Sequence, residues 1–436
     1  MYPFRYGHAR HQDWQQAVEV VLAQMRAGPA ARPSGGTDGA ADGEAHGPAH
    51  ELPAWKAREL RHGSPDAAAA MSGMGPASTL GLVYVTESFG NRLSAIIDLF
   101  RQRTGLPHWA GAVAAGVCAT GAEYHDEPAL VAMLAELPPD SFRLFEGRPP
   151  PQRLAIEDHA GDMAPFTALV HASPSTPELP EVIADLSQRI ATGYLFGGIV
   201  GGADGMAAHY AGRPAGSGLS GVLFADSVRL MSRVTQGCAP LGGEHVISDC
   251  MSHYIRSLDG QPALDVMLED LGVEQPMRAS RDGEAILRSL PHERLRRGLL
   301  VGIATQGTDR RVGFRDYLVR NLLGIDPHNR LLAVAAGPRR GERVVFCTRD
   351  RQTARADLIR VCTELRDELE SERQPARGAL YFSCVARGLH LFGSPGAELD
   401  IIRHNLGDVP LIGMYANGEI ARSHLYGHTG VLTLFV

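Results

Sequence analysis

The chain has 436 residues, a formal charge of −7 and a single lysine, Lys56, beside 41 arginines. This composition argues against Schiff-base chemistry, pyridoxal phosphate binding and lysine-dependent phosphate loops, because Lys56 lies in a stretch too poor in large apolar residues to pack. The evenly mixed charges argue against a nucleic-acid partner, and the longest apolar runs fall short of the roughly 18 residues of a membrane span.

The first predicted element is a helix over about residues 11–25, where Trp14, Val18 and Leu22 share one face. The opening residues lack a signal-peptide core. From Gly28 to Thr79 the sequence consists mainly of Ala, Gly, Pro, Ser and His, which predicts a disordered insertion or linker. We therefore assign residues 1–27 to an N-terminal helix of the first half and 28–79 to the linker.

The next segment, 80–255, alternates short apolar runs with glycine and proline. LGLVYV at 80–85 predicts a buried strand, and the following helix carries Leu93 and Phe100 on one face and ends at Gly105. A further strand leading into a glycine turn is expected over 109–121, and others near 153–156, 166–170, 194–200 and 221–224. The region is expected to be one domain of mixed α/β character.

A boundary is expected near 255–262, where Pro262 begins a helix that Gly272 ends. Beyond it, 256–436 repeats the mixed pattern, and one long amphipathic helix is predicted over 351–372. Strands are predicted at 299–304, 331–336, 344–347, 379–383, 411–415 and 431–435. The expected fold class is mixed α/β (α+β), with two mixed-sheet halves and flanking helices.

Two motifs have conventional functional interpretations that their surroundings do not favour. GSGLSG at 216–221 has dinucleotide-loop spacing, but a strand-like run follows it instead of a helix. His424 and His428 are four residues apart, as in a metal pair, yet nearby glycines predict a turn and no third ligand is identifiable. We therefore expect neither a cofactor nor a metal.

Three of the six cysteines lie in glycine-bearing turns beside predicted strands: Cys118, Cys238 and Cys384. Such turns can direct side chains and free N–H groups toward an anion. These cysteines can also be small buried thiols that fill space. A nucleophile would need a base within reach, and His245, seven residues after Cys238, is one candidate.

Several segments together resemble FIST-domain proteins, over about Leu80 to Val436. They include TQGCAPLGGEHVI, GALYFSCVARG and the ending NGEIARSHLYGHTGVLTLF, with a FIST N-terminal domain at 80–255 and a FIST C-terminal domain at 256–436. The resemblance implies a sensory module that binds small ligands, such as amino acids, in intracellular signalling. It places the ligand-binding residues at Cys118, Gln236, Cys238, Cys384, Arg387, Asn417, Gly418, Glu419, His428 and Thr429, with no catalytic residue.

In this interpretation Arg387 would hold a carboxylate and Glu419 an ammonium group. The protein would be a non-catalytic cytoplasmic sensor that binds a small polar metabolite and acts through a separate signalling output protein or through self-association. Two alternatives stay open: an enzyme with Cys238 or Cys384 as nucleophile and His245 or His428 as base, and a protein-binding scaffold without a small ligand.

Overall fold

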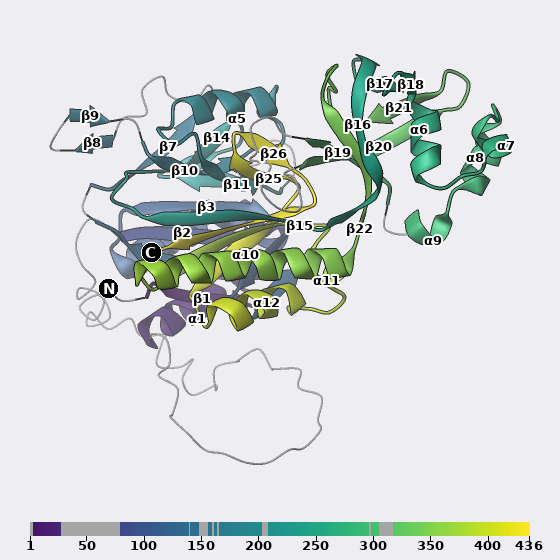
Figure 1. Ribbon diagram of the computed structural model, residues 1–436. Coiled ribbons are helices and arrows are strands. Elements are labelled where there is room, and N and C mark those ends of the chain that lie inside the picture. The colour runs from purple at the N-terminus through teal and green to yellow at the C-terminus, as the bar shows by residue number, and fades with distance from the viewer. Residues whose placement is uncertain are drawn as a thin grey trace, which may run out of the picture.

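The computed structural model describes residues 3–27, 79–138, 140–147, 156–158, 161–163, 165–202, 208–295, 298–304 and 317–436. The predicted linker at 28–79 lies outside this range except for Thr79, as does Lys56. The described chain forms a large body of three six-stranded sheets and a smaller β-structure that projects from one end of it (Figure 1).

The first body sheet contains only strands that precede residue 216. Helices α1 (Trp14–Ala27) and α4 (Leu93–Thr104) cover its outer face, and the short helix η1 (Glu87–Arg92) leads into α4. The strand order is β1 (Arg5–Arg10), β6 (Ala129–Glu136), β2 (Thr79–Thr86), β3 (His108–Ala114), β12 (His209–Ala211) and β13 (Pro214–Ala215).

The other two body sheets combine strands from both ends of the chain. In one, β4 (Gly116–Ala119) pairs with β24 (Leu411–Ala416), and in the other β11 (Leu195–Ile199) pairs with β25 (Glu419–Arg422). The first also contains β5 (Ala122–His125), β15 (Leu230–Gln236), β23 (Gly378–Cys384) and β27 (Thr429–Phe435); the second contains β7 (Phe142–Gly147), β10 (Thr167–Ala172), β14 (Leu219–Phe224) and β26 (His424–Tyr426). The two halves of the sequence therefore build common sheets.

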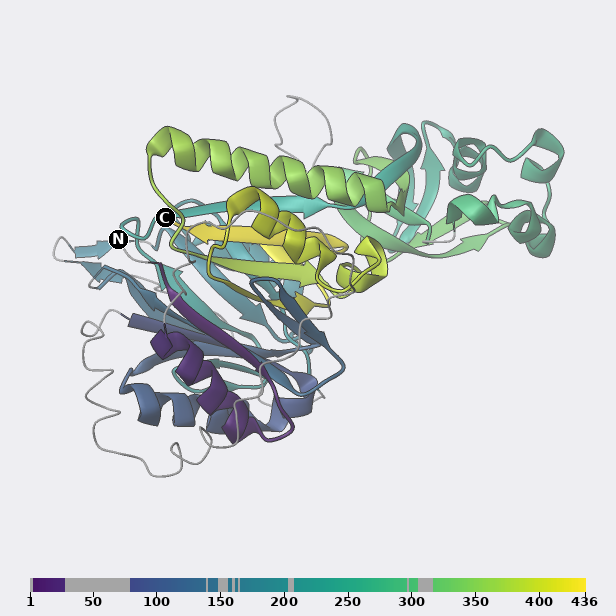
Figure 2. The ribbon, with the colours of Figure 1, turned by 90° about the horizontal axis from the view of Figure 1, so that it is seen from below.

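Helices close the body on two sides. Figure 2 shows α10 (Arg351–Glu372) and α12 (Ala397–Leu406) on one side, with α1 and α4 on the other. The short helix α11 (Gly388–Phe392) packs beside α10 and α12, and α5 (Leu179–Gln188) lies near β26. A separate hairpin joins β8 (Ile156–Asp158) to β9 (Gly161–Met163).

The projecting structure is a closed antiparallel β-barrel, since its sheet order returns to its first strand through an additional pairing between β16 and β17. Its strands are β16 (Cys238–Met251), β22 (Arg343–Arg349), β19 (Leu300–Ala304), β20 (Tyr317–Asp326), β21 (Leu331–Val334) and β17 (Tyr254–Leu258), with β18 (Gln261–Pro262) attached to β17. Four helices accompany it: α6 (Ala263–Asp270), α7 (Gln275–Arg278), α8 (Gly283–Ser289) and α9 (His292–Leu295).

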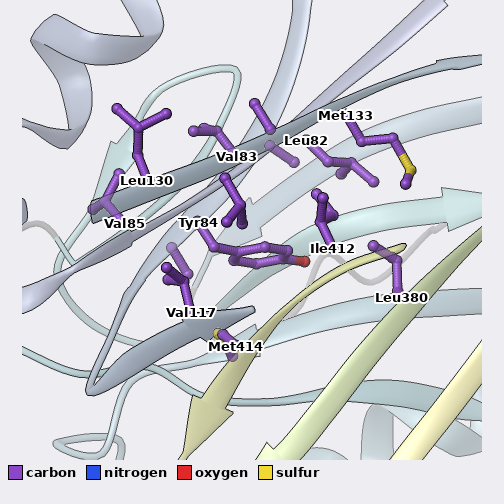
Figure 3. Close-up of a cluster of buried hydrophobic side chains, with 14 of the residues drawn as sticks. Leu82, Val83, Tyr84, Val85, Val117, Leu130, Met133, Leu380, Ile412 and Met414 are labelled. Atoms are coloured by element: carbon purple, nitrogen blue, oxygen red, sulfur yellow. The ribbon is translucent and has the colours of Figure 1, made fainter. Parts of the chain in front are cut away.

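The main core of the body also joins the two halves. Figure 3 shows Tyr84 and Val117 from the first half against Leu380, Ile412 and Met414 from the second. All five side chains are fully buried. Burying a large apolar side chain contributes about 1.5–3 kcal/mol, so this shared core holds the two halves together.

The predicted fold class is confirmed: the protein is an α+β fold with several mixed sheets. The long helix has the predicted bounds, and Gly105 adopts a left-handed conformation (φ 71°) at the end of α4. GSGLSG leads into β14, where a Cβ on Gly221 would lie 1.9 Å from the Leu169 carbonyl oxygen. This glycine therefore permits close backbone approach. In the described residues, no helix is long and apolar enough to cross a bilayer.

Candidate ligand site between body and barrel

The candidate site forms where several strand ends of one body sheet meet. Gln236 at the end of β15 pairs with Thr429 at the start of β27, and Ser383 near the end of β23 pairs with Gly430. Since β23 and β24 are parallel, Cys384 and Ala416 end at the same edge. The chain enters the barrel from this edge, through Gly237 into β16. The site is therefore at the junction of body and barrel.

Arg387 is fully buried there in an ion pair with Glu398 of α12. Its Nε donates to Glu398 Oε1 at 2.7 Å, and Tyr381 donates to the same oxygen at 2.6 Å. Ser383 and the Gly388 amide donate to Oε2 at 3.2 and 3.1 Å. Glu398 therefore lies along the Nε and Nη2 side of the guanidinium.

The other end of the guanidinium is less constrained. Arg387 Nη1 is buried and has no hydrogen-bond partner among the described residues. A Cβ placed on Gly237 would lie 3.3 Å from this nitrogen and 3.0 Å from side-chain atoms of Ala354 and Leu391, so glycine allows the chain to pass close to the guanidinium. The unpaired Nη1 is therefore a donor that a small acceptor would satisfy.

Glu419, the first residue of β25, is also fully buried. Thr429 donates its hydroxyl (2.8 Å) and its amide (3.1 Å) to Oε2, whereas Oε1 has no partner within the described part of the chain. Burial raises the pKa of this carboxyl to about 8, although Thr429, Arg387 and the Cys384 thiol act in the opposite direction. Glu419 is therefore largely protonated at neutral pH.

His428 lies beside this carboxyl in the turn before β27, with a left-handed backbone (φ 61°). Its Nε2 lies 3.3 Å from Asn321 Oδ1 of the barrel, and its Nδ1 is buried without a partner in the described structure. Burial lowers the pKa of His428 to about 4, and Arg349, Arg320 and Arg387 reinforce the shift. The ring is neutral in a positive environment.

Two barrel arginines connect the barrel to the body around the site. Arg349 of β22 donates to the Ala386 carbonyl at 3.0 Å, and Arg320 of β20 donates to the Leu425 carbonyl at 2.8 Å. Gln236 adds a third link, since its side-chain amide donates to the Tyr317 carbonyl at 3.0 Å. These contacts place positive charge next to Arg387 and Glu419.

The two site cysteines differ in their electrostatics. Burial and the Glu419 carboxyl raise the pKa of the Cys384 thiol to about 12. The pKa of Cys238 is lowered instead, first by a hydrogen bond from Cys347 and then by Arg387 and Arg349, against the effect of burial. Both ring nitrogens of His245 bind carboxylates, Asp259 at 2.7 Å and Asp270 at 3.0 Å, so this ring is not available as a base for Cys238.

The structure brings most of the predicted site residues to this junction and leaves three elsewhere. Cys118 is buried in β4, Asn417 is exposed, and Gly418 contributes its carbonyl to the Ile199 amide at 2.8 Å. Burial, Glu123 and Glu398 raise the pKa of Cys118 well above its usual value. The residues at the junction are Gln236, Cys238, Cys384, Arg387, Glu419, His428 and Thr429.

Four polar residues of the junction were not predicted from the sequence: Arg320, Arg349, Cys347 and Glu398. Only Glu398 has a signal in the sequence, because it shares the buried face of α12 with Ile401 and Ile402. For metals, the described residues contain no group of three or more His, Cys, Asp and Glu that could hold an ion.

Family models match both halves of the chain. The FIST N domain matches residues 79–261, and the FIST C domain matches residues 263–422. The chain belongs to the FIST family. FIST domains are sensory domains of signal transduction. Most residues of the candidate site lie in the FIST C match, Gln236 and Cys238 lie in the FIST N match, and His428 and Thr429 follow the end of the FIST C match.

Similar curated proteins come from mycobacteria. One uncharacterized protein of Mycobacterium tuberculosis is 30% identical over 345 residues, which cover 75% of this chain and 83% of the relative. An uncharacterized protein of Mycobacterium bovis is 28% identical over 381 residues, covering 83% of this chain and 92% of the relative. The similarity therefore covers most of the length of both relatives.

Proposed function

We propose that this FIST protein is a cytoplasmic sensor that binds a small carboxylate-bearing metabolite, such as an amino acid, at the junction of body and barrel. The observation that carries the proposal is a group of buried polar atoms without partners in the described residues: Arg387 Nη1, Glu419 Oε1 and His428 Nδ1. A buried polar group left unpaired costs about 1–3 kcal/mol, and more when it is charged. Three such atoms on separate elements support a site that a polar molecule completes.

The charges around these atoms favour an anionic group on the ligand. Glu398 neutralises Arg387, while Arg320 and Arg349 add positive charge close to a largely protonated Glu419. An approaching ammonium group would favour the ionised form of Glu419, because opposite charges stabilise one another in a buried site. A ligand with both a carboxylate and an ammonium group therefore suits the two sides of the site.

The position of the site suggests how binding would become a signal. Hydrogen bonds from Arg320, Arg349 and Gln236 cross the junction around it. A ligand that recruits these groups would change how tightly the barrel is held to the body. A separate output protein, or a second copy of the chain, would then recognise the altered arrangement.

A thermal-shift screen with the proteinogenic amino acids and small carboxylic acids tests this proposal, followed by calorimetry on any compound that raises the melting temperature. Glu419→Gln should weaken binding by about tenfold or more, equivalent to about 1.4 kcal/mol, because an amide cannot become the anion that pairs with an ammonium group. The matched control is Glu181→Gln on the exposed start of α5, which should bind like the wild type.

Two results would contradict the proposal. One is the absence of any stabilising compound in the screen. The other is a compound whose affinity is the same for Glu419→Gln, Glu181→Gln and the wild type, since it would bind elsewhere.

A further inference from the structure

A pair of thiols lies on the barrel side of the junction, where sequence analysis identified only one of them. Cys238 begins β16, and Cys347 lies on the neighbouring strand β22. In the register of these strands Cys347 pairs with Pro240 and Cys238 pairs with Arg349, which makes the two cysteines diagonal neighbours. Both side chains are buried, with exposed fractions of 4% and 3%, and form a small cluster with Leu300 and Val319.

The surroundings shift the pKa values of the two thiols in opposite directions. The hydrogen bond from Cys347 lowers the pKa of Cys238, and the positive charges of Arg387 and Arg349 act in the same direction. The same hydrogen bond raises the pKa of Cys347 far above its usual value. A thiol with a lowered pKa next to a second thiol has the arrangement of a nucleophilic cysteine with a resolving partner.

The other described thiols lack this arrangement. Burial raises the pKa of Cys118, Cys362 and Cys384, and Cys250 donates to the Pro338 carbonyl at 3.2 Å. Among the described thiols, a lowered pKa and a neighbouring thiol coincide at Cys238.

We propose that Cys238 and Cys347 form a redox-responsive dithiol site whose substrate is a small hydroperoxide. The Cys238 thiolate attacks the terminal oxygen of the hydroperoxide, which breaks the O–O bond, oxidises the sulfur to a sulfenic acid and releases an alcohol, or water from hydrogen peroxide, after protonation. The Cys347 thiol then attacks the Cys238 sulfur, forms a disulfide and releases water. A dithiol reductant returns the pair to its reduced form by thiol–disulfide exchange.

Disulfide formation would change the structure around Arg387 in the ligand site. The redox inference does not depend on the proposed ligand. A bond of about 2.05 Å between diagonal neighbours requires the strands to move, because the Cα atoms of such pairs lie about 7–8 Å apart. Gly237 lies next to Arg387 Nη1 and accepts a hydrogen bond from the Asp350 amide at 2.9 Å. A shift of Cys238 toward Cys347 would therefore move the chain beside Arg387.

The test uses the full reduced protein, treated with hydrogen peroxide, blocked with N-ethylmaleimide and analysed by peptide mass spectrometry. The expected product is a disulfide between the Cys238 and Cys347 peptides that dithiothreitol removes. Cys347→Ala should abolish the disulfide and leave a sulfenic acid on Cys238 that dimedone traps. Cys250→Ser, which removes a half-buried thiol from the same strand, is the matched control and should form the disulfide at the wild-type rate.

A second measurement does not depend on disulfide formation. The alkylation rate of Cys238 in the wild type should reach half its maximum below pH 8.5, the midpoint of an ordinary thiol. Cys347→Ala should raise this midpoint, with about tenfold less thiolate at neutral pH for each unit of increase. The proposal is overturned if peroxide oxidises other cysteines before Cys238, if no disulfide to Cys347 forms, or if the midpoint is the same in both proteins.

Discussion

Glu398 and Glu419 both interact electrostatically with Arg387 and are equally buried, but their surroundings differ. Glu398 receives hydrogen bonds from Tyr381, Ser383, Arg387 and the Gly388 amide, so both of its oxygens are occupied. Among the described residues, hydrogen-bond donors reach only Oε2 of Glu419, and its pKa is raised to about 8. Burial alone therefore does not decide the role of a carboxylate. The donors around it separate a structural ion pair from a group available to a ligand.

The largest effect is expected from Glu398→Gln, which tests the structural role of Glu398. This change leaves the buried Arg387 without its counter-charge, and breaking a buried ion pair costs about 3–5 kcal/mol. Urea denaturation should show this loss, whereas Glu181→Gln on the surface should stay within about 0.5 kcal/mol of the wild type. A loss below about 1 kcal/mol would mean that Glu398 does not carry the structural role inferred from its four donors.

The pH dependence of the free energy of unfolding should show that Glu419 has a raised pKa. Its pKa is about 4.5 in the unfolded chain and about 8 when folded, so the folded state holds the proton more tightly. The resulting stabilisation is fully present below the lower value and is lost as the pH rises through the higher one. Between about pH 6 and pH 9 the wild type should lose about 2–3 kcal/mol relative to Glu419→Gln.

Denaturation curves of the wild type and Glu419→Gln at both ends of this range provide the measurement. If the difference in free energy of unfolding between the two proteins is the same at both pH values, the Glu419 carboxyl does not titrate in this range. It would then resemble Glu398 in its role.

The smallest effect is expected at Asn417, which the family resemblance placed in the site and the structure places on the surface. Asn417→Ala should change the free energy of unfolding by less than about 0.5 kcal/mol. Its affinity for any compound found in the ligand screen should equal that of the wild type, as measured by calorimetry. A tenfold loss of affinity would extend the site beyond the groups around Glu419.

Features of the fold that depend on residues close together in the sequence could be predicted from it. The helix at 351–372 has an apolar face that repeats over 22 residues, and Gly105 follows its helix where a left-handed residue is needed. Strand β1, RYGHAR, was not predicted from the sequence. Its buried residues are the small Gly7 and Ala9, which lie among polar side chains and give no apolar pattern. Its register partners on β6 lie at residues 129–134, too far along the chain for a local pattern to indicate them.

The candidate site was predictable only in part for the same reason. Family motifs identified Arg387, Glu419 and His428, but the arginines and the thiol of the barrel lie far away in the sequence. Cys347 reaches Cys238 through a strand pairing that spans more than a hundred residues. A single sequence contains no signal for such a pairing, whereas Glu398 could have been identified as an acidic residue on an apolar helix face.

The pairing of β4 with β24 also affects how the protein is made. Strand β4 ends at Ala119, and its partner β24 begins at Leu411, near the end of the chain. At a synthesis rate of about 5–20 residues per second, β24 leaves the ribosome many seconds after β4. The nascent first half meanwhile carries an open sheet edge, which can pair with other chains. We therefore expect chaperones to hold this protein until its last strands emerge.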